Sequence, residues 1–325
     1  MKVFVTGGAG YIGSVVVSML RASGHEVTVF DNLECGHREA LPADVPLIVG
    51  DLRNPDEINA AVAKVRPDAV MHFAAYALVG ESMKHPEIYF RNNVVGTFNL
   101  LEAMRLAGVG QIVFSSSCAT FGQPSTPTIV EGTPQHPTNP YGESKLMIEQ
   151  MLRWYGEIHG LNWAALRYFN ACGATETLGE AHAIETHLIP LVLRVALGQS
   201  DHVTVFGTDY DTPDGSCLRD YVHVLDLGDA HLRALEQHGQ GAYNLGIGNG
   251  FSVLEVVESA RRITGHAIPA VMGERRPGDP ARLVAGVGRA RTELGWSPRF
   301  TEIDQIVESA WKWHKAHPNG YASAK

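Results

Sequence analysis

Two residues suited to acid–base chemistry stand four positions apart in the stretch Pro140-Tyr141-Gly142-Glu143-Ser144-Lys145. A proline at the first turn predicts that a helix begins here, and the four-residue spacing then places Tyr141 and Lys145 on one face. A lysine ammonium beside a phenol stabilises the phenolate and lowers the tyrosine pKa, which makes tyrosine usable as a base. The pattern Tyr-x-x-x-Lys alone is common on solvated helices, so the chemical interpretation needs support from the rest of the chain.

A glycine-rich turn near the N-terminus predicts a dinucleotide site. The first 31 residues follow the order strand, glycine turn, amphipathic helix, strand and acidic residue. Gly7, Gly10 and Gly13 let the backbone approach a pyrophosphate, to which the helix N-terminus offers free amides and a positive dipole. Asp31 is placed to accept hydrogen bonds from an adenosine ribose and to repel a 2'-phosphate, which favours NAD over NADP.

Strand and helix patterns continue to alternate after this unit, which predicts an α/β fold with a Rossmann-type doubly wound parallel sheet. The later strands are expected at 47–49, 69–73, 111–114, 161–168 and 241–245, and the helices at 55–65 and from about 86 to 106. Ligands of such sheets bind beyond the carboxyl ends of the strands. Small or polar residues follow several strand ends and are expected near the cofactor: Asp51, Ala74, Ala75 and the serines at 115–117. Core packing and turn capping are the ordinary alternatives for them.

From about Phe169 the pattern loosens into loops and short elements, which predicts a smaller α/β substrate-binding domain. The expected division is an NAD-binding domain of 1–168 plus about 220–248, and a substrate-binding domain of about 169–219 plus 249–325. Arg219, Arg275 and Arg276 are candidates for binding phosphate through the guanidinium fork. Any one of them alone is more often a surface or salt-bridge residue.

Composition excludes several classes of protein. A length of 325 residues allows about two domains, and a net charge of -9 argues against a nucleic-acid or anionic-membrane surface. The four cysteines lie far apart without a Cys-x-x-Cys pair, so neither a zinc site nor a disulfide framework is expected, and no metal is predicted. No apolar run reaches spanning length, and a strand starting at Lys2 leaves no room for a signal peptide, which favours a cytoplasmic protein.

Longer stretches of the sequence carry a likeness to a known family. The glycine turn with Asp31-Asn32, the serine cluster and Tyr141-x-x-x-Lys145 together resemble the extended short-chain dehydrogenase/reductase superfamily. Within it, the chain most resembles the UDP-glucose 4-epimerase family, in stretches that follow the family order over almost the whole chain. These are His72-Phe-Ala, Val79-Gly-Glu-Ser82, Asn92-Asn-Val-x-Gly-Thr97, Phe114-Ser-Ser-Ser117, Pro140 to Lys145, Leu166-Arg-Tyr-Phe-Asn170, Val205-Phe-Gly-Thr-Asp-Tyr210, Arg219-Asp-Tyr-x-His-Val224, Tyr243-Asn-Leu-Gly246 and Arg275-Arg-Pro-Gly-Asp279.

The resemblance implies an NAD-dependent enzyme that inverts C4 of a UDP-hexose through a transient 4-keto sugar. It gives Tyr141 the role of base and acid, and Lys145 the roles of holding the nicotinamide ribose and lowering the tyrosine pKa. Ser117 then hydrogen-bonds the sugar 4-oxygen, and Asn92 supports the site.

The resemblance also implies two sets of binding residues. The NAD contacts are Gly7, Gly10, Tyr11, Ile12, Gly13, Asp31, Asn32, Asp51, Leu52, Phe73, Ala74, Ala75, Asn92, Ser115, Tyr141, Lys145 and Tyr168. The UDP-sugar contacts are Ser117, Tyr141, Phe169, Asn170, His187, Leu188, Phe206, Arg219, Arg276 and Asp279. Among these, Phe206 is expected near the uracil, and Arg219, Arg276 and Asp279 at the UDP phosphates and ribose.

Three places depart from the family pattern. Ala77 stands where many relatives carry a lysine near the cofactor, so one NAD contact is expected to be missing. His187-Leu188 replaces a common Asn-Leu pair at the diphosphate. Leu283 falls where the family sets how bulky a 2-substituent on the sugar is accepted, and it leaves N-acetylated substrates open.

Alternative functions remain open at this point. Another nucleotide-sugar enzyme of the superfamily, such as a UDP-N-acetylhexosamine, UDP-pentose or UDP-uronate 4-epimerase or a decarboxylase, would use the same constellation. A dehydratase is disfavoured because Cys118, not an acid, follows Ser117. A catalytically idle NAD-binding scaffold or redox sensor would not need Ser117, Tyr141 and Lys145 together.

Two helices, from about 88 to 106 and from 141 to 158, predict a homodimer, because family members pair through them as a four-helix bundle. The second helix carries apolar residues on more than one side: Met147, Met151, Leu152, Trp154 and Tyr155. Packing inside the monomer is the alternative explanation for them.

Overall fold

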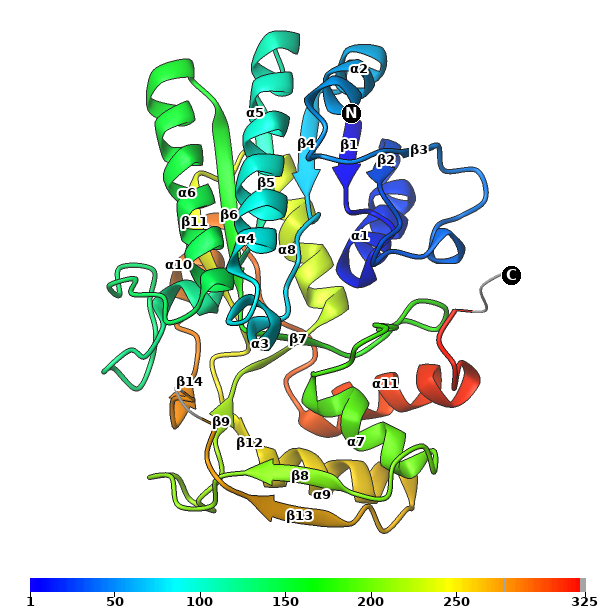
Figure 1. Cartoon of the computed structure of the whole chain (residues 1–325), viewed down its shortest axis with the longest axis vertical. Helices are drawn as coiled ribbons and strands as arrows, with labels where there is room; N and C mark the ends of the chain where they lie inside the picture. The colour runs from blue at the N-terminus through cyan, green and yellow to red at the C-terminus, as the bar shows by residue number, and fades with distance from the viewer. Residues whose placement is uncertain (277–278, 322–325) are drawn as a thin grey trace.

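The computed structural model describes residues 1–276 and 279–321, and a seven-stranded sheet dominates it (Figure 1). Its strand order is β11-β6-β5-β4-β1-β2-β3, and every neighbouring pair is parallel. The strands are β1 (Lys2–Thr6), β2 (Glu26–Asp31), β3 (Leu47–Val49), β4 (Ala69–His72), β5 (Gln111–Ser117), β6 (Asn162–Tyr168) and β11 (Gly241–Leu245). The predicted doubly wound parallel sheet is therefore confirmed.

Helices cover both faces of this sheet because its strands are apolar on both sides. Side chains alternate along a strand, so in β1 Val3 and Val5 join one core cluster while Phe4 joins the other. The first cluster is covered by α1 (Tyr11–Ala22) and α8 (Val224–Glu236), and the second by α2 (Pro55–Val65), α5 (Gly96–Ala107) and α6 (Pro140–His159).

The single helix expected from about 86 to 106 consists of three consecutive segments. These are α4 (Pro86–Tyr89), the π-helical η2 (Phe90–Val95) and α5. The wider turn falls at Asn92 and Asn93, and the Asn93 side chain bonds both backbone groups of Tyr76 and the Ser144 hydroxyl. A π-helical segment is typical of functional sites, and this one adjoins the cavity described below.

A smaller lobe lies below the sheet in Figure 1 and has its own apolar cluster, formed mainly by α7, α9 and α11. Its elements are β7 (Asn170–Cys172), α7 (Leu188–Ala196), β8 (Val203–Phe206), β9 (Leu218–Arg219), β10 (Tyr221–His223), β12 (Phe251–Ser252), α9 (Val253–Thr264), β13 (Ala270–Gly273), β14 (Arg282–Leu283) and α11 (Ile303–Ala316). The remaining short elements of the chain are η1 (Arg38–Ala40), α3 (Val79–Ser82), η3 (Cys118–Phe121) and α10 (Gly288–Leu294).

We propose two domains that follow the predicted division with one change. The segment from Ala285 to Trp296, which includes α10, packs into the core beneath the large sheet. The Trp296 indole also donates a hydrogen bond of 2.9 Å to the Asp226 carbonyl at the start of α8. We therefore place this segment with the NAD-binding domain, although the sequence assigned all of 249–325 to the substrate domain.

Asp220 links the two lobes. Its buried carboxylate accepts hydrogen bonds from the backbone amides of Ile247, Gly248 and Ala285 at 2.7, 3.0 and 3.0 Å. Burial raises the pKa of Asp220 to about 6, although the three amides oppose that shift. The carboxylate thereby holds the chain after β11 against the segment that leads to α10.

Two observations bear on the cellular setting. Within residues 1–276 and 279–321, no helix is both long enough and apolar enough to span a membrane. All four cysteines are free.

Candidate active site

A cavity of about 870 Å³ opens at the carboxyl ends of the central strands and is lined by residues of both lobes. Every residue predicted to contact NAD lines it. Of the predicted substrate contacts, Ser117, Tyr141, Phe169, Asn170, His187, Arg276 and Asp279 line it. Leu188, Phe206 and Arg219 are absent from its wall. Ala77 and Leu283, two of the departures from the family pattern, also face it.

The glycine turn has the shape that a pyrophosphate site requires. Gly7 has a φ of +72°, and a Cβ on it would lie 2.4 Å from the Ala74 amide nitrogen. A Cβ on Gly13 would lie 2.2 Å from the Gly7 carbonyl oxygen. The α1 helix that follows has no side-chain cap and no acidic residue in its first turn, so its first amides are open to an anion. The residues present thus fit a dinucleotide.

Asp31 ends β2 at the edge of the cavity. Its two carboxylate oxygens accept hydrogen bonds from the Ala9 and Leu33 amides at 3.0 and 2.9 Å, which fix the side chain. Burial raises the pKa of Asp31, whereas the two amides act to lower it. A carboxylate oxygen accepts more than one hydrogen bond, so Asp31 retains capacity for a ribose hydroxyl.

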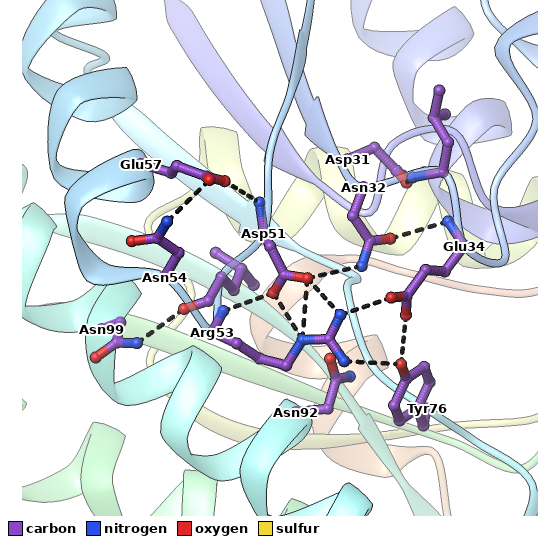
Figure 2. Close-up of polar contacts among 12 residues, drawn as sticks. Asp31, Asn32, Glu34, Asp51, Arg53, Asn54, Glu57, Tyr76, Asn92 and Asn99 are labelled. Atoms are coloured by element: carbon purple, nitrogen blue, oxygen red, sulfur yellow. Dashed lines mark hydrogen bonds and ion pairs between the residues drawn. The ribbon is translucent and has the colours of Figure 1, made fainter.

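Figure 2 shows a charged network beside Asp31 that links the loops following β2, β3 and β4. Arg53 donates to both oxygens of Asp51 at 2.9 Å, to Glu34 at 2.6 Å and to the Tyr76 hydroxyl at 3.2 Å. The Tyr76 hydroxyl in turn donates to Glu34. Arg53 holds the pKa of Asp51 below its usual range, so this predicted adenine contact is a carboxylate already paired with a cation.

Ser117 and Tyr141 meet at the cavity wall between β5 and α6. Helix α6 begins at Pro140 as predicted, and the Asn139 side chain caps it by accepting from the Gly142 amide at 2.8 Å. A Cβ on Gly142 would lie 2.4 Å from the Ala119 carbonyl, so glycine lets the helix pack against η3. The Ser117 hydroxyl accepts a hydrogen bond from the Ala119 amide at 3.1 Å and acts to lower the pKa of Tyr141.

Burial dominates the electrostatics of the Tyr141 and Lys145 pair. It raises the pKa of Tyr141 to about 12, and the Ser117 hydroxyl opposes that shift only in part. Burial also lowers the pKa of Lys145 to about 7. The Lys145 ammonium donates to the Ser115 carbonyl at 2.7 Å and lies 5.8 Å from the Tyr141 ring centroid. Desolvation therefore outweighs the lowering of the tyrosine pKa that the four-residue spacing predicted.

A buried ion pair supports this wall from behind. Glu149, one helical turn beyond Lys145, pairs with Arg167 of β6 at 2.6 Å, and both side chains are buried. Glu149 also accepts from the Ser116 hydroxyl at 2.6 Å and from Gln135 at 3.2 Å. These contacts join β5, β6 and α6, and the Glu149 charge acts to raise the pKa of Lys145.

Two arginines of the smaller lobe each contact another residue predicted to bind the substrate. Arg276 lies over the Phe206 ring, 4.0 Å from its centroid, and Arg219 lies 3.5 Å from the Asp279 carboxylate. Phe206 and Arg219 thus adjoin the cavity through residues that line it. Residues 277 and 278, within the motif at 275–279, lie outside the described residues.

A model of the NAD dependent epimerase/dehydratase family matches residues 3–246. This chain belongs to that family. It is 51% identical to the UDP-glucose 4-epimerase of Halalkalibacterium halodurans, over 99% of this chain and 98% of that one. It is 50% identical to the UDP-glucose 4-epimerase of Streptomyces lividans, over 98% of each chain.

Solved structures of family members have the same fold. UDP-glucose 4-epimerase from Brucella ovis in complex with NAD superposes with a TM-score of 0.93 at 44% identity, covering 98% of both chains. The enzyme from Bifidobacterium longum in complex with NAD+ and UDP superposes with a TM-score of 0.93 at 38% identity, covering 99% of this chain and 100% of that one. The family resemblance inferred from the sequence is confirmed, and so is the assignment of NAD as its cofactor.

Several residues of this family member's site were not predicted. Arg53, Glu34 and Tyr76 come from three separate loops, so no single motif signals their network. Glu180 and His182 also line the cavity, from the long loop between β7 and α7. A signal for them existed in the sequence, since Glu180-x-His182-x-x-Glu185-x-His187 spaces four ligand-type side chains over eight residues.

Proposed function

We propose that this chain is an NAD-dependent epimerase that inverts C4 of a UDP-hexose and interconverts UDP-glucose and UDP-galactose. The observation that carries the proposal is the Ser117, Tyr141 and Lys145 constellation in the same cavity as a dinucleotide turn. Curated relatives of nearly the same length, named UDP-glucose 4-epimerase, support the choice of sugar.

Tyr141 is the proposed proton acceptor and donor at the 4-hydroxyl of the sugar. NAD, when bound, supplies the hydride acceptor and donor that allow C4 to pass through a ketone. Ser117 lines the cavity with Tyr141, and its hydroxyl is the proposed hydrogen-bond partner of the sugar oxygen as the proton moves. Lys145, held by the Ser115 carbonyl, supplies the nearby positive charge that favours the Tyr141 phenolate, the form that accepts the proton from the sugar.

We propose that the remaining predicted contacts hold the UDP portion. Arg276 and Asp279 line the cavity, while Phe206 stacks on Arg276 and Arg219 faces Asp279. Leu188 opens α7, whose first turn carries no acidic residue and no side-chain cap, so its amides suit a diphosphate. Firm binding of UDP with few sugar contacts would let the ketose turn over without escaping.

We propose a cytoplasmic homodimer that pairs through α5 and α6. Trp154 and Ile158 on α6 are 51% and 67% exposed, as expected for an unpaired face, whereas Leu152 packs inside. Free cysteines fit a reducing compartment. Sedimentation at micromolar concentration is expected to give a dimer for the wild type, and a monomer at all concentrations would contradict this proposal.

Conversion of UDP-galactose to UDP-glucose by the purified chain tests the function. The chain is incubated without and with added NAD, and with UDP-N-acetylgalactosamine, a UDP-pentose and a UDP-uronate in parallel. The expected result is the fastest C4 inversion for UDP-galactose. Faster inversion of another sugar would assign the chain to a neighbouring specificity, and absence of any turnover in the presence of NAD would favour a non-catalytic role.

A further inference from the structure

Four side chains with metal-binding atoms converge in the loop between β7 and α7. They belong to Glu180, His182, Glu185 and His187, and one ligand atom of each lies within 4.8 Å of all the others. Glu180, His182 and His187 line the same cavity as Ser117, Tyr141 and Lys145, but the proposed proton and hydride transfers use none of the four side chains. In the proposal below, His187 acts as a metal ligand and not as the UDP contact that the family resemblance implied.

The separations in the cluster resemble those around a tetrahedral ion. The His187 Nδ1 atom lies 2.7 Å from Glu180 Oε1 and 2.9 Å from Glu185 Oε1. The His182 Nδ1 atom lies 3.2 Å from Glu180 Oε1 and 3.7 Å from Glu185 Oε2. Ligand atoms bound to Zn²⁺ at about 2.0–2.1 Å in a tetrahedron lie about 3.3 Å apart, within the range of these four distances.

One nitrogen of the cluster is left without a hydrogen bond. The His182 Nδ1 atom is buried and makes no hydrogen bond, although Glu180 Oε1 and Glu185 Oε2 lie only 3.2 and 3.7 Å away. A buried polar atom without a partner is costly, and a bound cation would satisfy it.

The charges in the cluster also favour a cation. The Glu180 and Glu185 side chains are only 5% and 1% exposed, so two carboxylates lie side by side away from water. Like charges in such a position repel unless a positive charge lies between them. The two histidines supply that charge only while they are protonated, whereas a divalent ion supplies it with the imidazoles neutral.

We propose that Glu180, His182, Glu185 and His187 bind a single Zn²⁺ ion that closes the loop over the cofactor cleft. Two imidazole nitrogens and two carboxylate oxygens fill the four positions of a tetrahedral zinc site. A zinc site whose four coordination positions are all filled by protein side chains is typical of structural zinc. The ion therefore fixes the loop and takes no part in the reaction.

The loop that the ion fixes touches the glycine turn. The His182 ring packs edge-on against the Tyr11 ring at 6.4 Å, and the Tyr11 hydroxyl donates to the Gly173 carbonyl at 2.5 Å. His37 bonds the Ala181 carbonyl at 2.8 Å. The metal site therefore joins the smaller lobe to the part of the sheet lobe that faces the cofactor pyrophosphate.

Zinc binding by the intact chain tests the proposal, and it does so independently of any epimerase activity. The purified protein is stripped with a chelator, dialysed and titrated with Zn²⁺ against a chromogenic competitor. One zinc per chain is expected. The His182→Ala and Glu185→Gln variants are expected to bind zinc at least about 10-fold more weakly than the wild type. Loss of a residue that merely supports a metal ligand already costs about 10–100-fold in affinity.

The matched control is His85→Ala. His85 lies in an exposed pair with Glu87 at 3.7 Å, outside the cluster, and its replacement is expected to leave zinc affinity unchanged. Two measurements on the wild type avoid any folding defect of the variants. Co²⁺ is expected to give the intense visible spectrum of a tetrahedral site, and Zn²⁺ is expected to slow amide hydrogen exchange in 180–187. Zinc at background level after titration, or equal affinity in the His182→Ala and wild-type chains, would overturn the proposal.

Discussion

Replacing Tyr141 with phenylalanine is expected to lower kcat for UDP-galactose epimerisation by about 10²–10⁴-fold, the usual contribution of a positioned acid–base group. The substitution removes the hydroxyl whose pKa Ser117 acts to lower and keeps the buried ring. The fold is expected to survive, because loss of one hydrogen bond costs about 1 kcal/mol. Initial rates measured at saturating UDP-galactose, alongside a thermal melt, separate the loss of chemistry from a loss of folded protein.

Tyr155→Phe provides the matched control on the same helix. The Tyr155 hydroxyl donates to Glu102 at 2.6 Å, and Tyr155 does not line the cavity. The Tyr155→Phe variant therefore loses a hydrogen bond that lies outside the site, and its kcat for epimerisation is expected to match that of the wild type. Comparable activity in the Tyr141→Phe and Tyr155→Phe chains would remove Tyr141 from the proton transfer.

Replacing Arg167 with methionine is expected to lower the free energy of unfolding by about 3–5 kcal/mol, because it strands a buried carboxylate. Arg167 bonds Glu149 through Nε at 2.9 Å and through Nη2 at 2.6 Å, and both side chains are buried. Denaturant unfolding monitored by tryptophan fluorescence measures the loss. Adding Glu149→Gln to this variant removes the stranded charge and is expected to recover part of the stability.

The control for this prediction is Arg153→Met, also on α6. Arg153 pairs with Glu157 at 3.0 Å, with both side chains half exposed to water. A solvated helix pair of this kind contributes about 0.3–0.5 kcal/mol. If the Arg167→Met chain is no less stable than the Arg153→Met chain, the buried network does not hold the catalytic wall together.

The sequence was sufficient to predict the fold and the main wall of the site. Gly7, Asp31, Ser117 and Tyr141 are far apart in the chain, but each follows or adjoins the carboxyl end of a strand. A parallel sheet brings those ends to one edge, so topology alone predicts that the residues meet. All four residues line one cavity in the structure.

Sequence periodicity and motif spacing could not predict features that depend on burial or on the positions of irregular loops. Spacing predicted that Lys145 would lower the Tyr141 pKa, but the sign of the shift depends on how far both groups are removed from water. The network of Arg53 joins loops whose relative positions no periodicity encodes. The spacing of the cysteines predicted no metal site, while the His/Glu spacing at 180–187 lies in a loop without a regular pattern.

In the proposed reaction, C4 of the UDP-hexose is oxidised and then reduced again within one closed cleft. The most direct test uses UDP-galactose carrying deuterium at C4, incubated with the NAD-loaded chain in ordinary water and followed by mass spectrometry and NMR of the product. The expected product is UDP-glucose that retains deuterium at C4, since the hydrogen on carbon never exchanges with water. UDP-glucose with ordinary hydrogen at C4, or no UDP-glucose at all, would contradict it.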